Sequence, residues 1–212
     1  MRGPLILRVV SGRIGPGDLH AVTDSFRRSY APVARQAPGL ARFVVGVRPA
    51  EGEAHDVAAV TVWDSVDLAL AAYGGDLAVP RTLDGRDHGA RFDRVDYYEL
   101  GAALMVRSAD EPSLLRLTAG TVARGLDADI QGDLRTRLPE LPEEAVEAYV
   151  GRRVLGGSVE IAFASTWSGL PEGIPLDAPI WPSISDRYDA FRMEIHEIAL
   201  VGDGPAGPQL PD

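Results

Sequence analysis

A run of β-strand-forming residues that ends in tryptophan occurs twice in this chain, and it constrains the fold more than any other feature. Residues 57–65 have the sequence VAAVTVWDS and residues 159–169 the sequence VEIAFASTWSG. A strand-like run precedes each copy, and a triplet of ring, acid and aliphatic residue follows each tryptophan after about 30 to 35 residues, at 98–100 and 196–198. Landmarks that recur in the same order predict a tandem duplication of one α+β unit.

Length and composition set the class of protein. A chain of 212 residues suits two domains of about 100 residues each, and 45% apolar with 25% charged residues is typical of a soluble globular protein. No apolar run reaches the roughly 20 residues that span a bilayer, and residues 1–8 lack the apolar core of a secretory signal. We therefore expect a cytoplasmic protein without a membrane partner. The net charge of −10 opposes binding to nucleic acid.

Three residue types are missing: the chain has no cysteine, no lysine and no asparagine. Without cysteine there is neither a disulfide nor a thiolate nucleophile, and without lysine there is neither Schiff-base catalysis nor a P-loop. The histidines do not have metal-ligand spacing, so we expect no protein-built metal site. His20 is expected in solvent, and His55 and His88 in polar loops.

The first half, residues 1–100, has the order β-α-β-β-α-β. Strands are expected at 5–10, 43–47, 57–63 and 95–100. One helix carries an apolar stripe at spacings of 3, 4, 4 and 3, namely Leu19, Val22, Phe26, Tyr30 and Val33. A second helix begins after the capping residue Ser65 and ends at Gly74-Gly75.

The second half, residues 101–200, is expected to repeat this order. The pattern predicts a strand at 102–106 and a helix that opens at Pro112-Ser113. Apolar residues at every fourth position are expected to continue that helix, namely Val122, Leu126, Ile130, Leu134 and Leu138. A hairpin is expected at 145–155 and 159–167, a short turn at 184–188 and a closing strand at 191–200. Residues 201–212, rich in glycine and proline, are expected to form a flexible tail.

A four-stranded sheet with helices on one face leaves its other face apolar and uncovered. Two such units can cover each other sheet to sheet. We therefore expect two tandem ferredoxin-like units packed as an intramolecular α+β barrel, a pseudo-dimeric monomer that could also form a homodimer.

The faces of the tryptophan strands suggest where a ligand could bind. Alternation places Ala59, Thr61 and Trp63 on one face, and these small side chains predict space beneath the helix that carries Phe26 and Tyr30. The second copy, with Ile161, Phe163 and Trp167, is filled, so the first unit is the expected site of a pocket. Tyr73, Tyr98 and His196, which stands where Tyr98 stands in the first copy, are further candidates. The alternative is that all of these residues fill core volume.

Four segments of the first half resemble the antibiotic biosynthesis monooxygenase family: residues 37–46 (APGLARFVVG), 60–65 (VTVWDS), 69–76 (ALAAYGGD) and 97–100 (YYEL). The second half resembles it loosely, through Val150-Gly151, Thr166-Trp167 and residues 196–198. The resemblance implies the dimeric α+β barrel fold. It leaves the function broad, because the superfamily includes cofactor-free quinone-forming monooxygenases, haem-degrading enzymes and isomerases.

Departures from the family narrow this choice. Haem-degrading members use an asparagine, a tryptophan and a histidine ligand; Trp63 matches the tryptophan, but asparagine is absent and Ala72 or Tyr73 stands near the histidine position. The resemblance therefore disfavours haem, although Tyr73 could ligate iron. Cofactor-free members also use an asparagine, so only Trp63, Tyr73 and Arg81 or Arg86 carry over.

The expected function is a monooxygenase or related tailoring enzyme of secondary metabolism that acts on an aromatic, polyketide-like molecule without metal or flavin. Trp63 would form the pocket wall, Tyr73 and Tyr98 would hold or deprotonate a hydroxyl, and Arg86 would stabilise developing negative charge. The alternative is a non-catalytic barrel that binds a small ligand or haem.

Overall fold

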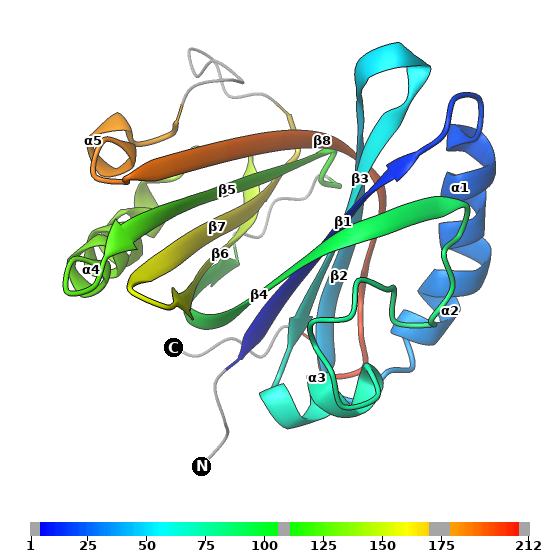
Figure 1. Ribbon diagram of the computed structural model, residues 1–212, viewed down its shortest axis with the longest axis horizontal. Coiled ribbons are helices and arrows are strands. Elements are labelled where there is room, and N and C mark those ends of the chain that lie inside the picture. The colour runs from blue at the N-terminus through cyan, green and yellow to red at the C-terminus, as the bar shows by residue number, and fades with distance from the viewer. Residues whose placement is uncertain (1–4, 106–110, 170–178, 208–212) are drawn as a thin grey trace. The chain divides into compact units, whose positions relative to one another are not determined.

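The computed structural model describes residues 5–105, 111–169 and 179–207 (Figure 1). The chain divides into two compact units, and each is described by itself. The first unit consists of Met1–Tyr97 and His196–Gln209, and the second contains Tyr98–Ile195. Two long strands, β4 (Ala90–Met105) and β8 (Ala190–Asp203), run through both units.

The sheet of the first unit has the strand order β4-β1-β3-β2-β8. Its complete strands are β1 (Ile6–Ile14), β2 (Leu40–Pro49) and β3 (His55–Trp63). The expected hairpin of β2 and β3 is confirmed, and a short 3₁₀ turn at Glu51–Glu53 lies between the two strands. Helix α3 (Val66–Ala72) is also confirmed: Ser65 Oγ accepts from the amide of Leu68 at 3.3 Å, and positive φ angles at Gly74 and Gly75 end the helix.

The helical stretch after β1 changes its pitch halfway. Helix α1 (Leu19–Ser25) passes into a π-helical turn (Phe26–Tyr30) and then into α2 (Ala31–Ala34). Pro32 lacks an amide hydrogen and its ring conflicts with the carbonyl four residues earlier, which a wider turn relieves. Because the turn is wider, the next buried position of the helix falls one residue later than regular α-helical spacing predicts. Ala34 is buried and Val33 is 42% exposed, so the expectation that Val33 faces the core is wrong.

The sheet of the second unit has the order β8-β5-β7-β6-β4. Its complete strands are β5 (Leu114–Ala123), β6 (Ala145–Leu155) and β7 (Ser158–Trp167), and the hairpin of β6 and β7 is confirmed. Helix α4 (Asp127–Arg137) is followed by a 3₁₀ turn at Leu138–Glu140. The expected turn at 184–188 is the short helix α5 (Pro182–Ser185).

The helix expected from Pro112-Ser113 is wrong over its first part, because residues 114–123 form β5. This strand pairs with β7 from Leu114↔Trp167 to Ala123↔Ser158. Val122 is buried on the strand, whereas Ile130 and Leu134 are buried on α4. The apolar residues spaced four apart therefore belong to two different elements. The strand expected at 102–106 is also wrong as a separate element: β4 continues past Gly101 with a bulge, and residue 106 lies outside the described residues.

The two units share their register. Trp63 pairs with Ile6 and Leu40, and Trp167 pairs with Leu114 and Ala145. A register shift follows in both units, between Leu40 and Arg42 and between Ala145 and Glu147. Each tryptophan Nε1 also donates to the hydroxyl two residues earlier, Thr61 at 3.0 Å and Ser165 at 2.9 Å. This equivalence supports the proposed tandem duplication.

Because β4 and β8 each belong to both units, the hydrogen-bonded strand order closes on itself as β1-β3-β2-β8-β5-β7-β6-β4. The expected α+β barrel class is confirmed. The segment that begins at His196 belongs to the first compact unit, together with the start of the chain. β8 extends to Asp203, three residues into the segment expected as a tail, and residues 208–212 lie outside the described part.

Candidate functional site

The residues expected to line a pocket in the first unit form a packed cluster. Ala59 and Trp63 project from β3 into the same buried core as Phe26, Tyr30 and Tyr73. Thr61 joins them through its hydroxyl, which accepts from Trp63 and lies 3.4 Å from the Tyr73 hydroxyl. The rings of Trp63 and Tyr73 meet edge to face with centroids 5.7 Å apart.

Arg8, which the sequence did not single out, occupies the space beside these small side chains of β3. Its guanidinium carbon lies 3.8 Å from the ring centroid of Tyr73. Its nitrogens donate to the carbonyls of Leu77, Val79 and Arg81. The side chain is 1% exposed, so burial lowers its pKa. Arg8 therefore fastens the segment after α3 to the sheet and fills the opening expected there.

Tyr73 is placed to donate a proton in a hydrogen bond. Burial raises its pKa, and the nearby Arg8 charge opposes that rise only in part. The phenol is therefore neutral near pH 7. Its hydroxyl lies within the packed cluster, beside that of Thr61.

The other expected site residues are divided between the two units. Tyr98 and Trp167 belong to the second unit, where the Tyr98 hydroxyl donates to Glu160 and accepts from Arg192, each at 3.1 Å. His196 is buried in the first unit on β8. Arg86 is exposed on the loop before β4, beside a groove rather than in the buried cluster.

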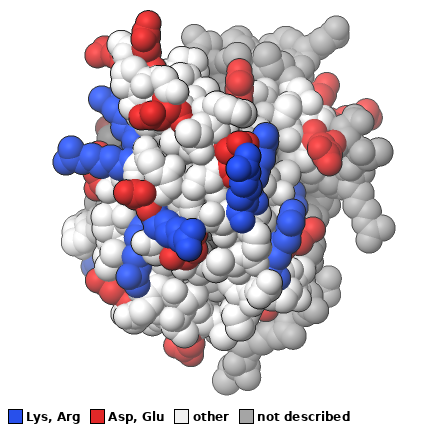
Figure 2. Space-filling model, turned by 90° about the vertical axis from the view of Figure 1, so that its right-hand side faces the viewer, with Lys and Arg blue, Asp and Glu red and all other residues white. Residues whose placement is uncertain are grey.

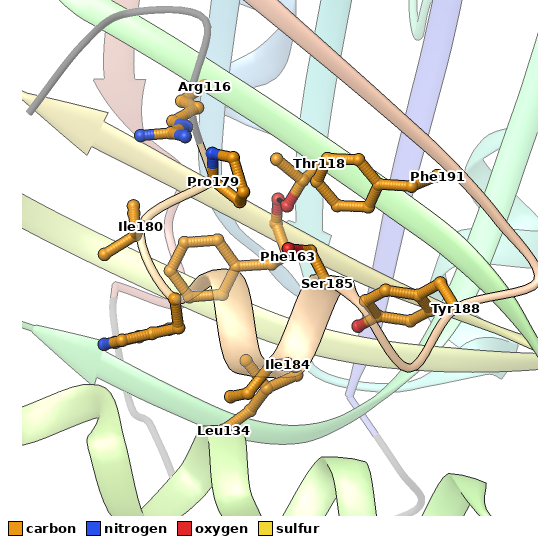
Figure 3. A pocket seen from close by; sticks show the side chains of 11 residues that line it. Arg116, Thr118, Leu134, Phe163, Pro179, Ile180, Ile184, Ser185, Tyr188 and Phe191 are labelled. Carbon is orange, nitrogen blue, oxygen red and sulfur yellow. Dashed lines mark hydrogen bonds between the residues drawn. The ribbon is translucent and has the colours of Figure 1, made fainter.

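A pocket between helices and sheet lies in the second unit, and none of the ten expected site residues lines it. Four aromatic side chains contribute to its wall, from β7, from the loop around α5 and from the start of β8: Phe163, Trp181, Tyr188 and Phe191. Figure 3 shows Phe163 in the middle of the group, with Tyr188 and Phe191 to one side and Arg116 and Pro179 to the other. Trp181 meets Phe163 edge to face at 5.6 Å, and Tyr188 stacks on Phe191 at 5.7 Å.

Two polar side chains at this aromatic pocket, Arg116 and Tyr188, indicate what kind of ligand it suits. Arg116 on β5 is 5% exposed, burial lowers its pKa, and its Nη2 lies 2.9 Å from the sulfur of Met193. Burial also raises the pKa of Tyr188 to about 12. Of the residues that line the pocket, Arg116 carries the only formal charge and none is acidic. A guanidinium beside aromatic walls is suited to a flat molecule with an anionic oxygen.

The backbone of β5 makes room for this wall. A Cβ on Gly120 would lie 2.3 Å from the ring of Tyr188, so only glycine lets that ring lie against the strand. The cavity itself measures about 30 Å³, room for water and not for a ring. A ligand must therefore displace rim side chains, of which Phe191 is 40% exposed.

His88 lies in the loop before β4, as expected, but its side chain is buried. Its side chain is 0% exposed, and its ring stacks on Phe26 with centroids 4.5 Å apart. Ser25 lies at hydrogen-bond distance from one ring nitrogen and Asp84 from the other. Local polarity concealed this burial, because the covering aromatic residues come from the helix about 60 residues earlier. The only local hint was an acid and a histidine four positions apart.

No group of three or more histidine and acidic residues in the described part of the chain is arranged to hold a metal ion. On the face in Figure 2, basic and acidic side chains are interspersed without a continuous basic patch. Among the helices of the described residues, none has the length and apolar character to cross a bilayer.

Comparison with known proteins gives the fold and leaves the chemistry open. No protein-family profile matches the chain, and no curated protein matches it. A Fusobacterium nucleatum protein described as a monooxygenase is similar in structure, with a TM-score of 0.73 over 100% of this chain and 99% of that one at 8% identity. An anthrone oxidase-like protein follows with a TM-score of 0.60, covering 94% and 93% at 11% identity.

A Listeria monocytogenes ferredoxin-fold protein, related to antibiotic biosynthesis monooxygenases, covers 93% of this chain and 95% of its own at 6% identity, with a TM-score of 0.50. The chain has the fold of these monooxygenase-like α+β barrels. The resemblance stated from the sequence is confirmed at the level of the fold, and identities of 6 to 11% carry no residue-level assignment.

Proposed function

We propose that the chain binds a small aromatic molecule with an acidic oxygen in the pocket of the second unit, and that it is a monooxygenase acting on such a molecule. The observation that carries the proposal is the buried guanidinium of Arg116 at an aromatic-walled pocket. The guanidinium would donate hydrogen bonds to an oxyanion, and the aromatic side chains would contact the ring of the ligand. The similarity to an anthrone oxidase-like protein favours an anthrone or a naphthol as the class of ligand.

The chemistry follows from stabilising the anion. A phenol or anthrone held as its oxyanion is electron-rich enough to react with O₂. In an anthrone, one oxygen atom becomes a ring carbonyl and the other leaves as water. The residues of the pocket would orient the ring, stabilise its negative charge and, through the neutral Tyr188 hydroxyl, donate a hydrogen bond.

A non-catalytic ligand-binding protein is the second candidate. Haem fits the second unit poorly, because all four histidines of the chain lie outside residues 98–195. The raised pKa of Tyr188 also disfavours the phenolate form that would ligate iron. We therefore expect no Soret shift on titration with haem.

The test combines binding with turnover. We expect 1-hydroxy-2-naphthoate to quench tryptophan emission, and Trp181→Phe to remove most of this signal. Arg116→Met should weaken binding of the naphthoate about 10-fold or more, leave binding of neutral naphthalene-methanol unchanged, and abolish O₂ uptake with dithranol, an anthrone. Arg28→Met is the control, since Arg28 is an exposed arginine of the first unit.

Three results separate the alternatives. Binding without O₂ uptake favours the non-catalytic protein. Loss of binding in Tyr73→Phe, with Arg116→Met unaffected, moves the site to the Trp63 and Tyr73 cluster of the first unit. Equal quenching by the charged and neutral naphthalenes in the wild type contradicts the role of Arg116.

A further inference from the structure

Ser25, His88 and Asp84 form a hydrogen-bonded row in the first unit. Ser25 Oγ lies 2.9 Å from His88 Nδ1, and His88 Nε2 lies 2.9 Å from Asp84 Oδ1. Ser25 is half-buried on α1, whereas the side chains of His88 and Asp84 are 0% and 5% exposed. A hydroxyl at the surface is thus connected through a buried imidazole to a buried carboxylate.

The carboxylate determines which nitrogen of the ring carries the proton. An ionised carboxylate only accepts hydrogen bonds, so His88 Nε2 must be protonated to donate to Asp84. In the neutral imidazole, Nδ1 then has the free lone pair and accepts from the Ser25 hydroxyl. This direction of donation polarises Ser25 Oγ toward nucleophilic character.

The loop holds these groups in place at a cost in backbone energy. Asp84 Oδ1 also accepts from Thr82 Oγ1 at 2.8 Å and from the amide of Arg86 at 3.3 Å. His88 has a φ of +54°, in the left-handed region that is strained for a non-glycine residue. Its ring is fixed between Phe26, stacked at 4.5 Å, and Tyr30, edge-on at 6.1 Å. Fixed geometry of this kind is what general-base catalysis requires.

We propose that Ser25, His88 and Asp84 are a catalytic triad for the hydrolysis of small carboxylic esters. Ser25 Oγ attacks the ester carbonyl carbon while its proton passes to His88 Nδ1, and Asp84 stabilises the imidazolium. The bond from carbon to the alcohol oxygen breaks as His88 returns that proton to the leaving group. Water then releases the acid by the same route, so that one ester and one water give one acid and one alcohol. None of these three residues lines the aromatic pocket, and the proposal does not rest on the proposed monooxygenase function.

A fluorophosphonate probe tests the nucleophile. We expect one label per chain, on the peptide that contains Ser25. Asp84→Asn should reduce the labelling rate at least about 100-fold, because the amide no longer fixes the ring tautomer. Hydrolysis of p-nitrophenyl acetate should fall with it. Ser29→Ala, in the next helical turn, should label as the wild type does.

Two outcomes overturn the triad. One is wild-type labelling no faster than that of Ser25→Ala. The other is an Asp84→Asn protein that keeps its circular dichroism spectrum and labels at the wild-type rate. Either leaves the binding of naphthoate by the second unit unaffected, so the two proposals fail independently.

Discussion

Burial lowers the pKa of two arginines, one in each unit, and their surroundings differ. Arg8 donates hydrogen bonds to three backbone carbonyls, and its guanidinium lies over the ring of Tyr73. It therefore joins the loop after α3 to the sheet. Arg116 lies at an aromatic pocket. Sequence pattern alone does not separate these roles, because both residues interrupt an apolar strand in the same way.

Arg8→Met should destabilise the protein. The methionine keeps much of the apolar volume but leaves the carbonyls of Leu77, Val79 and Arg81 without this donor, which we expect to cost roughly 2–4 kcal/mol. Urea denaturation followed by circular dichroism measures the loss. As a comparison, Arg28→Met should cost less than about 0.5 kcal/mol, because Arg28 is an exposed arginine. Equal losses for the two variants would contradict this distinction.

Tyr188 gives the protein an alkaline stability limit. Its pKa is about 12 in the folded protein and 10 in the unfolded chain, so the unfolded chain loses the proton first as pH rises. The resulting stability is complete below pH 10 and is lost between pH 10 and about 12. Allowing for its partial exposure, we expect a loss of about 1–2 kcal/mol.

The ultraviolet absorbance of tyrosinate and urea midpoints at pH 9 and 11 measure these two quantities. Tyr188→Phe should remove this part of the alkaline loss. An unchanged pH dependence in that variant would show that Tyr188 is not its source.

Among the individual helices and strands, the sequence pattern predicted some correctly and others not. The β2–β3 and β6–β7 hairpins and helix α3 could be predicted, because alternation, a serine cap and paired glycines are local signals. It could not be predicted that β5 is a strand, because Val122 continues the four-residue spacing of the apolar residues in the following helix. Its β-branched Thr118 and Thr121 were the available signal, and pairing with β7 outweighed the helical spacing.

The π-helical turn makes a paired prediction for its helix. Ala34→Asn should cost about 2 kcal/mol because it places an amide in a fully buried site, whereas Val33→Asn should change stability by less than about 0.5 kcal/mol. Thermal denaturation of the two variants measures both effects. The reverse ranking would mean that the helix keeps a regular α pitch through Pro32.

At the scale of the whole molecule, the last strand of each sequence repeat serves both units. Residues 99–105 of β4 pair with β6, and residues 197–203 of β8 pair with β2. Leu100 stands opposite Gly151, and Ile198 stands opposite Gly46. The two triplets that marked the repeat thus hold equivalent positions, each beside the strand of the other repeat.

This exchange predicts that the sequence halves do not fold alone. A fragment of residues 1–100 lacks the β8 segment and exposes the edge of β2, so we expect it to aggregate or to be only partly structured. Co-expression with residues 101–212 should restore a soluble pair of the size of the intact chain. Size-exclusion chromatography and circular dichroism measure both. A monomeric fragment 1–100 with a cooperative unfolding transition would contradict this account.

The sequence by itself determined the strands of the hairpins and the α+β class, because these depend on alternation and turn residues that lie close together in the chain. Only the tertiary structure decided that β4 and β8 serve both units, that Arg8 fills the first unit and that the aromatic pocket lies in the second. Each of these depends on which residues meet across long stretches of chain. Hydrogen bonding between strands and the volume of the packed side chains determine these long-range contacts, and local periodicity does not reveal either of them.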